Sequence, residues 1–121
     1  MWINERADRC RRQILGTAGM LGRAGQSTVL DIGLLRASDR QAIADAAREQ
    51  GLIVRLHSLE AGKEERWRRV DARNRDQGET FRLAVTRAMF DGVEVVWQPP
   101  TEDEMAQLDG VRVGGELAAA G

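Results

Sequence analysis

The sequence is poor in the residues on which metal and thiol chemistry depend. Its 121 residues contain one cysteine, one histidine and no tyrosine. The single cysteine, Cys10, forms no internal disulfide, and one cysteine with one histidine is too few for a Cys/His zinc site. No apolar run approaches the roughly 18 residues that a membrane-spanning helix needs, and the first residues show no signal-peptide pattern. We therefore expect a cytoplasmic protein with no membrane partner.

An excess of positive charge is also missing. The 18 lysines and arginines stand against 19 aspartates and glutamates, which gives a net charge of −1. Such a chain has no positive field to hold a polyanion, so we do not expect nucleic acid as a partner. Lys63 is the only lysine. The other cations are arginines, which bind phosphates through paired hydrogen bonds.

The first half of the chain alternates helical and strand-like patterns. Apolar residues spaced three and four apart predict a helix over residues 4–23, with Asn4 as its N-cap, and a second helix over residues 38–51. Short β-branched apolar runs predict buried strands at residues 27–32 and 52–57. The order helix, strand, helix, strand predicts parallel strands joined by helical crossovers.

The second half is mostly helical. A third helix is predicted over residues 62–74, followed by a polar stretch at residues 75–80 that is a candidate mobile loop. Thr86 is expected to cap a fourth helix, which the prolines at 99 and 100 end. After a short capped helical turn at Thr101, residues 111–113 have the pattern of a last strand.

Two glycine-containing stretches, residues 16–27 and 62–64, invite comparison with a phosphate-binding loop. Such a loop follows a strand, has the spacing G-x-x-x-x-G-K-[ST], and supplies a lysine and a hydroxyl group. The first stretch has no lysine, and the second has Glu64 where the hydroxyl is needed. We interpret them as a helix end and a helix start.

The most specific pattern is the arginine-rich run of residues 65–74. At about 100° per residue, Arg66, Arg69 and Arg73 lie within roughly 60° of one another, beside the apolar stripe of the helix. Three guanidinium groups next to a flexible loop suit bidentate binding of a phosphate chain. The alternative is a solvated helix whose arginines pair with neighbouring acidic residues. Those residues are Glu64, Glu65 and Asp71.

Asp31 lies at the end of the first predicted strand, where parallel-sheet proteins place functional groups. A carboxylate at this position can hold magnesium directly or through water. It can equally cap the following loop, and the pattern leaves both roles open.

Four motifs follow one another between residues 10 and 105. They are residues 29–34 (Val-Leu-Asp-Ile-Gly-Leu) with Asp39-Arg40, residues 65–74 (Glu-Arg-Trp-Arg-Arg-Val-Asp-Ala-Arg-Asn), residues 86–91 (Thr-Arg-Ala-Met-Phe-Asp) and residues 99–104 (Pro-Pro-Thr-Glu-Asp-Glu). In this order they resemble the second half of bacterial AAA-family P-loop kinase-like ATP-binding proteins, which are relatives of zeta toxins, polynucleotide kinase and chloramphenicol phosphotransferase.

The resemblance implies a site for ATP and magnesium. It makes Asp31 the catalytic and metal-binding carboxylate of a Walker-B-like strand, and Arg40 a catalytic cation on the substrate side. It makes Arg66, Arg69 and Arg73 the lid arginines that hold the nucleotide phosphates. The phosphate acceptor, the second expected partner, is not identified by the resemblance.

The family's first strand, phosphate loop (Walker A) and helix have no counterpart in these residues. The resemblance therefore implies an α/β fold that is a partial P-loop kinase-like domain, with a small, mostly parallel sheet flanked by helices. We expect residues 1–113 to form this single incomplete domain and residues 114–121 to be a disordered tail. The expected function is an ATP-binding, phosphotransferase-like domain that is inactive alone. The alternative is a non-catalytic interaction module, or a truncated relic, that dimerises or binds a partner chain through an open sheet edge.

Overall fold

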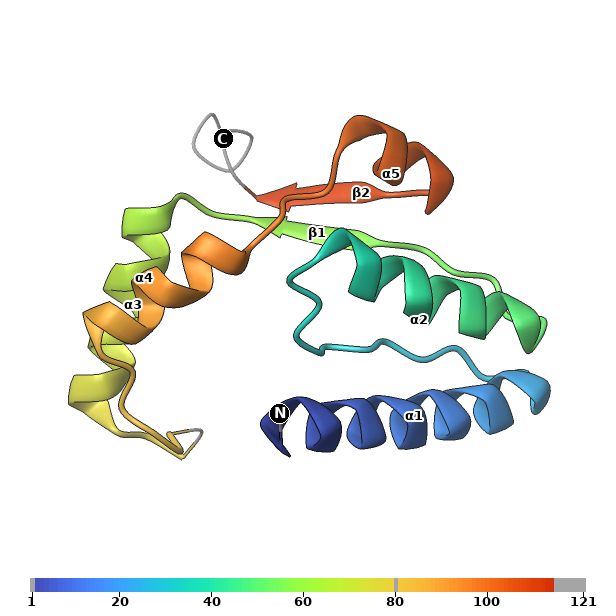
Figure 1. The fold of residues 1–121 in the computed structure, drawn as a ribbon, viewed down its shortest axis with the longest axis horizontal. Helices are drawn as coiled ribbons and strands as arrows, with labels where there is room; N and C mark the ends of the chain where they lie inside the picture. The colour runs from blue at the N-terminus through green and yellow to red at the C-terminus, as the bar shows by residue number, and fades with distance from the viewer. Residues whose placement is uncertain (1, 80, 115–121) are drawn as a thin grey trace. The chain divides into compact units, whose positions relative to one another are not determined.

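A computed structural model describes residues 2–79 and 81–114. The fold is mixed α/β, as the sequence predicted, and the described residues form five helices and two strands (Figure 1). The elements in order are α1 (Trp2–Arg23), α2 (Ala37–Glu49), β1 (His57–Glu60), α3 (Lys63–Asp76), α4 (Arg87–Val96), α5 (Glu102–Gln107) and β2 (Val111–Gly114). Among these helices none is both long and apolar enough to cross a membrane.

The chain divides into two compact units, Met1–Arg55 and Leu56–Gly121, which are described separately below. The expectation of a single domain over residues 1–113 stays a prediction. Of the predicted tail, Gly114 is the last residue of β2. Residues 115–121 lie outside the described part of the chain.

The first unit consists of α1, α2 and the segment that joins them. Helix α1 begins at Trp2, so Asn4 lies inside the helix and the predicted N-cap is wrong. The two helices bury a core of small and aliphatic side chains: Leu15, Ala18, Ala44 and Ala47. Small side chains allow the helix backbones to approach, at the cost of burying less apolar area per residue.

The glycine-rich stretch of α1 is a packing surface. A Cβ atom at Gly19 would lie 1.8 Å from Gln50 Oε1, and one at Gly22 would lie 2.1 Å from Leu52 Cδ2. Both distances are far below van der Waals contact, so the missing side chains make room for the chain that follows α2. This agrees with reading the stretch as part of a helix rather than as a phosphate loop.

Of the two strands predicted in the first half, the first is wrong and the second overlaps β1 only at His57. Residues 27–32 and residues 52–56 have no regular secondary structure, and β1 begins only at His57. Residues 27–35 form no backbone–backbone hydrogen bond with any described residue. Burial still alternates along this segment: Leu30 and Ile32 are half-buried, and Asp31 between them is exposed. The strand pattern is present, but no neighbouring strand pairs with it.

In the second unit, β1 and β2 form a parallel pair with His57 opposite Val111 and Glu60 opposite Gly114. Two further hydrogen bonds extend the ladder, from Leu56 N–H to Leu108 O (3.0 Å) and from Val111 N–H to Leu56 O (2.9 Å). The strands are parallel as predicted, because the chain between them passes through helices. Of these two strands, only β2 was predicted at the position where it is found, at residues 111–113.

The helices of the second unit begin where capping residues predicted. The Thr86 hydroxyl accepts a hydrogen bond from Met89 N–H (3.1 Å), and the Thr101 hydroxyl accepts one from Glu104 N–H (3.2 Å). Helix α3 runs two residues beyond the predicted end, so the polar stretch begins with helical residues. Gln77 then ends α3 in the left-handed conformation (φ 45°).

Candidate functional site

Arg66 joins helix α3 to helix α4. Its guanidinium donates two hydrogen bonds to the Glu94 carboxylate, one of which spans 3.0 Å from Nη2 to Oε2. Its Nε donates to Ala61 O (2.9 Å), and its guanidinium carbon lies 5.8 Å from the centre of the Phe90 ring. One face of the guanidinium and all three nitrogens are therefore engaged within the protein.

Arg69 and Arg73 lie on the exposed flank of α3. Arg69 Nε donates to Glu65 Oε1 at 3.0 Å, but the Arg69 side chain is 69% exposed. The side chain of Arg73 is exposed and forms no hydrogen bond or ion pair with any described residue. An exposed pair within one helix contributes about 0.3–0.5 kcal/mol, so it competes weakly with an incoming anion. Of the three arginines predicted to bind phosphate, these two are accessible.

The alternative interpretation of the arginine run is right in part. Glu65 pairs with Arg68 as well as with Arg69, and Asp71 pairs with Arg75 at 3.5 Å. Glu64, in contrast, forms its ion pair with a residue of another helix, Arg87 of α4. At about 100° per residue, Arg68 and Arg75 lie roughly 100–160° around α3 from Arg69 and Arg73.

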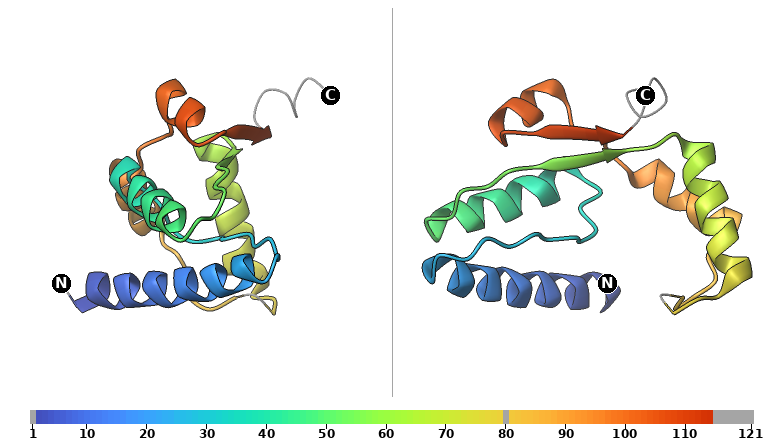
Figure 2. Two further views of the ribbon diagram at one scale, coloured as in Figure 1. Left: turned by 90° about the vertical axis from the view of Figure 1, so that its right-hand side faces the viewer. Right: turned by 180° about the vertical axis from the view of Figure 1, so that it is seen from behind.

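Helices α3 and α4 lie side by side (Figure 2), and four charged residues and two aromatic rings hold them together. Arg87 Nη2 lies 2.9 Å from Glu64 Oε1, Arg87 Nε lies 3.1 Å from Asp91 Oδ1, and Lys63 Nζ lies 3.1 Å from the same oxygen. The rings of Trp67 and Phe90 pack with their centres 5.5 Å apart. The sequence did not reveal these pairs, because Glu64 and Arg87 are 23 positions apart and only the fold brings them together.

A side-chain bridge closes the loop between the two helices. Asn74 Nδ2 donates to Val85 O at 2.7 Å, and Val85 N–H donates to Asn74 Oδ1 at 3.0 Å. The amide of Asn74 thus pairs with the backbone as a neighbouring strand would. Together with the Thr86 cap, it fixes the last turn of α3 beside the start of α4.

The ion pairs between α3 and α4 lower the pKa values of their carboxylates. The hydrogen bonds from Arg66 hold the pKa of Glu94 below its ordinary value of 4.5. Arg87 lowers the pKa of Glu64 in the same way, and the hydrogen bond from Lys63 lowers the pKa of Asp91. Each carboxylate is therefore stabilised in its charged form.

These shifts predict that the second unit loses stability in acid. A carboxylate whose pKa is lower when folded contributes stability above its unfolded pKa and loses it as the pH falls through the folded value. Stability should therefore fall as the pH drops below about 4.5, the ordinary value for Glu94. Glu94→Gln should cost about 1–3 kcal/mol at pH 7, because the Glu94 side chain is only 17% exposed and loses charge-assisted bonds.

Urea unfolding followed by circular dichroism at pH 7 and pH 3 measures both effects. The matched control is Glu49→Gln, which removes an exposed carboxylate of α2. The control should retain wild-type stability and the wild-type acid slope. A Glu94→Gln protein as stable as the control would show that this pair contributes nothing.

The other two predicted site residues belong to the first unit. Asp31 is exposed in the segment between α1 and α2. Arg40 is in α2 and only 4% exposed, and its Nη1 donates to Leu34 O at 2.9 Å. The role of Arg40 as a substrate-side cation stays a prediction.

Asp31 does not belong to a preformed metal centre. Within residues 2–79 and 81–114, no three His, Cys, Asp or Glu side chains lie close enough to hold a metal ion. Magnesium is commonly bound through one or two carboxylates plus water and substrate phosphates. Asp31 alone offers too few protein ligands for a resident ion, and its role as the carboxylate for a magnesium ion that arrives with the nucleotide stays a prediction.

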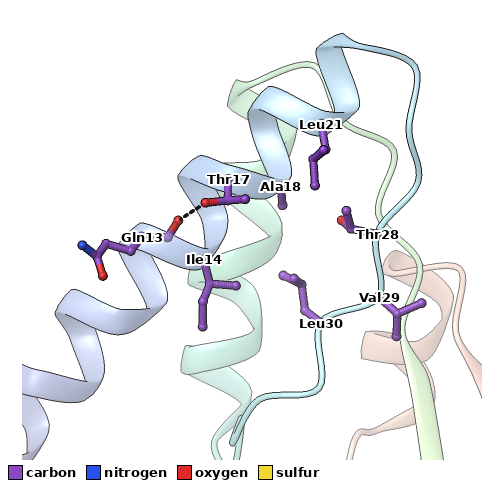
Figure 3. Close-up of a pocket in the computed structure, with 8 residues that line it drawn as sticks. All are labelled: Gln13, Ile14, Thr17, Ala18, Leu21, Thr28, Val29 and Leu30. Atoms are coloured by element: carbon purple, nitrogen blue, oxygen red, sulfur yellow. Dashed lines mark hydrogen bonds between the residues drawn. The ribbon is translucent and has the colours of Figure 1, made fainter.

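An open groove of about 500 Å³ lies between α1 and the segment that contains Asp31 (Figure 3). None of the residues that line it is charged. They are Gln13, Ile14, Thr17, Ala18, Leu21, Thr28, Val29 and Leu30. The sequence did not predict this groove, because it exists only where the predicted strand stays unpaired.

The sequence model of one protein family, described as an AAA domain, matches residues 2–96. The chain belongs to the AAA-domain family. This AAA domain is a nucleotide-binding domain of the P-loop NTPase-like type, and all five predicted site residues lie within the matched span. Comparisons with curated proteins and with solved structures give no match.

Proposed function

We propose that the chain is an ATP-binding, kinase-like phosphotransferase domain. We propose that Arg69 and Arg73 of the second unit hold the nucleotide phosphates and, separately, that Asp31 of the first unit is its functional carboxylate. One observation carries the proposal: within a domain of a nucleotide-binding family, α3 presents two accessible arginines on one flank. Both are solvent-exposed, and the helix that bears them is fixed to α4.

The spacing of the two arginines supports phosphate binding. Residues four apart on a helix have Cβ atoms about 5–6 Å from each other, so both guanidinium groups can reach one short phosphate chain. Each guanidinium can donate two parallel hydrogen bonds to a phosphate. Arg66 is not one of the proposed phosphate-binding arginines, because its guanidinium is hydrogen-bonded to Glu94. That pairing holds α3 against α4.

Two arginines alone give a weak phosphate site. In P-loop enzymes, the backbone amides and the lysine of the phosphate loop cradle the phosphates, and these 121 residues contain no such loop. We therefore expect the chain by itself to bind ATP–magnesium with a dissociation constant of about 1 mM or weaker, near −4 kcal/mol. On the same ground we expect no turnover by the chain alone.

Isothermal titration of the chain with ATP–magnesium tests this expectation. Binding should be weak, and titration with inorganic pyrophosphate should give similar heats, because the proposed contacts are to phosphate. A dissociation constant in the low micromolar range, about −8 kcal/mol, would contradict the account of how the phosphates are held.

A second candidate function is that of a non-catalytic module that pairs with another chain. The unpaired backbone of residues 27–35 favours it. So does the exposure of apolar side chains on the segments that were predicted as strands: Val29 is 95% exposed and Ile53 is fully exposed. Unpaired extended backbone with apolar side chains is the surface to which a further strand adds.

If this candidate is right, the chain should self-associate, because a second copy offers the same open segments. Light scattering after size-exclusion chromatography, run over a dilution series, measures the mass. We expect a dimer that dissociates on dilution, and Val29→Lys should shift it towards monomer by placing a charge in the uncharged edge. A monomer at all concentrations would count against this second candidate and leave the first untouched.

A further inference from the structure

The segment that carries Asp31 is held at its end by two arginines. Arg11 of α1 donates from Nη2 to Gly33 O at 3.1 Å, and Arg40 of α2 donates from Nη1 to Leu34 O at 2.9 Å. Two successive carbonyls, the second and third residues after Asp31, are thus bound from two different helices. Within the described part of the chain, no other backbone oxygen of residues 27–35 accepts a hydrogen bond.

These bonds replace the ladder that the segment lacks. Leu34 is half-buried, and a buried carbonyl without a partner costs about 1–3 kcal/mol, so the bond from Arg40 replaces a missing strand partner. Gly33 is exposed, and the bond from Arg11 holds its carbonyl as a second fixed point. Arg40 is 4% exposed, and a buried guanidinium persists only when it is hydrogen-bonded. The bond to Leu34 O is one of the contacts that satisfy this buried guanidinium.

The same geometry sets the direction of Asp31. Leu30, Ile32 and Leu34 are half-buried, whereas Asp31 and Gly33 are exposed. Side chains in such a segment alternate between two sides with a period of two residues. Fixing the carbonyls of residues 33 and 34 therefore also fixes the side on which Asp31 lies. A slip by one residue would bury the carboxylate and expose the leucines.

We infer that Arg40, together with Arg11, is a positioning residue for Asp31 and does not itself contact substrate. The inference rests on the proposed function of Asp31 as the site carboxylate. It assigns to the buried Arg40 a task different from the substrate-side role that the family resemblance implied. It also gives Arg11, which the sequence patterns did not single out, a part in the same site.

Backbone ¹⁵N order parameters of the 121-residue chain test the inference. In the wild type we expect values near 0.8 for residues 31–34, and in Arg40→Met and Arg11→Gln we expect values below about 0.6. Arg40→Lys, whose ammonium can still donate to Leu34 O, should keep most of the order. The control Arg12→Gln removes an exposed charge next to Arg11 and should change nothing. The order parameters within α1 and α2 should stay high in every variant.

Broadening of amide signals by manganese–ADP, added to the same samples, gives the functional readout. In the wild type, signals near Asp31 should broaden, and the broadening should weaken at least about threefold in Arg40→Met and Arg11→Gln. Absence of broadening in the wild type would count against the proposed function and leave the order parameters to decide the inference. Unchanged order parameters at residues 31–34 in folded Arg11→Gln and Arg40→Met would overturn it. If Arg40→Met does not fold, Arg11→Gln decides alone.

Discussion

Replacing Phe90 with alanine is expected to destabilise the second unit by about 3–5 kcal/mol. Phe90 is 8% exposed, and its ring packs against Trp67 with the centres 5.5 Å apart. The guanidinium carbons of Arg66 and Arg87 lie 5.8 and 5.6 Å from the ring centre. Removing the ring therefore leaves a cavity and deprives both cations of an aromatic face. Since whole domains are stable by only about 5–15 kcal/mol, this loss is large.

The matched control for Phe90→Ala is Val95→Ala on the same helix. Val95 is 87% exposed, so its truncation should change stability by less than about 0.5 kcal/mol. Urea unfolding followed by circular dichroism measures both variants. A loss below 1 kcal/mol for Phe90→Ala would show that the contact of α3 with α4 does not form a core in solution.

Removing Arg69 and Arg73 together is expected to abolish measurable pyrophosphate binding. Each charge-assisted contact contributes about 1.5–3 kcal/mol. At about 1.4 kcal/mol per factor of ten, the loss of both should weaken binding at least 100-fold. The double variant Arg69→Ala/Arg73→Ala should unfold at the wild-type urea concentration, because both side chains are exposed.

The matched control removes the same charge from the other side of α3. Arg68 and Arg75 are 74% and 70% exposed, and the one partner that each has among the described residues is an acidic residue of its own helix. The double variant Arg68→Ala/Arg75→Ala should therefore weaken pyrophosphate binding less than about threefold. Equal losses in the two double variants would mean that the anion responds to net charge rather than to one face of α3.

The helices were predictable from the sequence because their determinants are local. Thr86 and Thr101 form the expected caps, and α3 begins one residue after the predicted start at residue 62. The strands were not predictable in the same way. The run of residues 27–32 has a strand's alternation, but a strand also needs a hydrogen-bonding partner, which a pattern within six residues does not reveal. In contrast, residues 111–113 pair with β1 and form the expected strand.

The candidate site was predictable to a similar degree. Helical periodicity correctly placed Arg69 and Arg73 on one flank of α3, because that depends only on the turn angle. Periodicity also grouped Arg66 with them. In the structure, however, the Arg66 guanidinium is hydrogen-bonded to Glu94, which is 28 positions away. The positions of Arg40 and Arg11 depend on two helices and the segment between them. Local patterns contain no information on such contacts.

The most direct test of the account is to map where pyrophosphate binds, using amide chemical shifts of the ¹⁵N-labelled chain. We predict shifts concentrated between Arg69 and Gln77 on α3, with the same shifts absent in Arg69→Ala/Arg73→Ala. A second basic surface provides an internal comparison, since Arg6, Arg9 and Arg12 of α1 line a hollow of their own. Shifts centred on α1, or spread evenly over all arginines, would contradict the assignment of phosphate binding to α3.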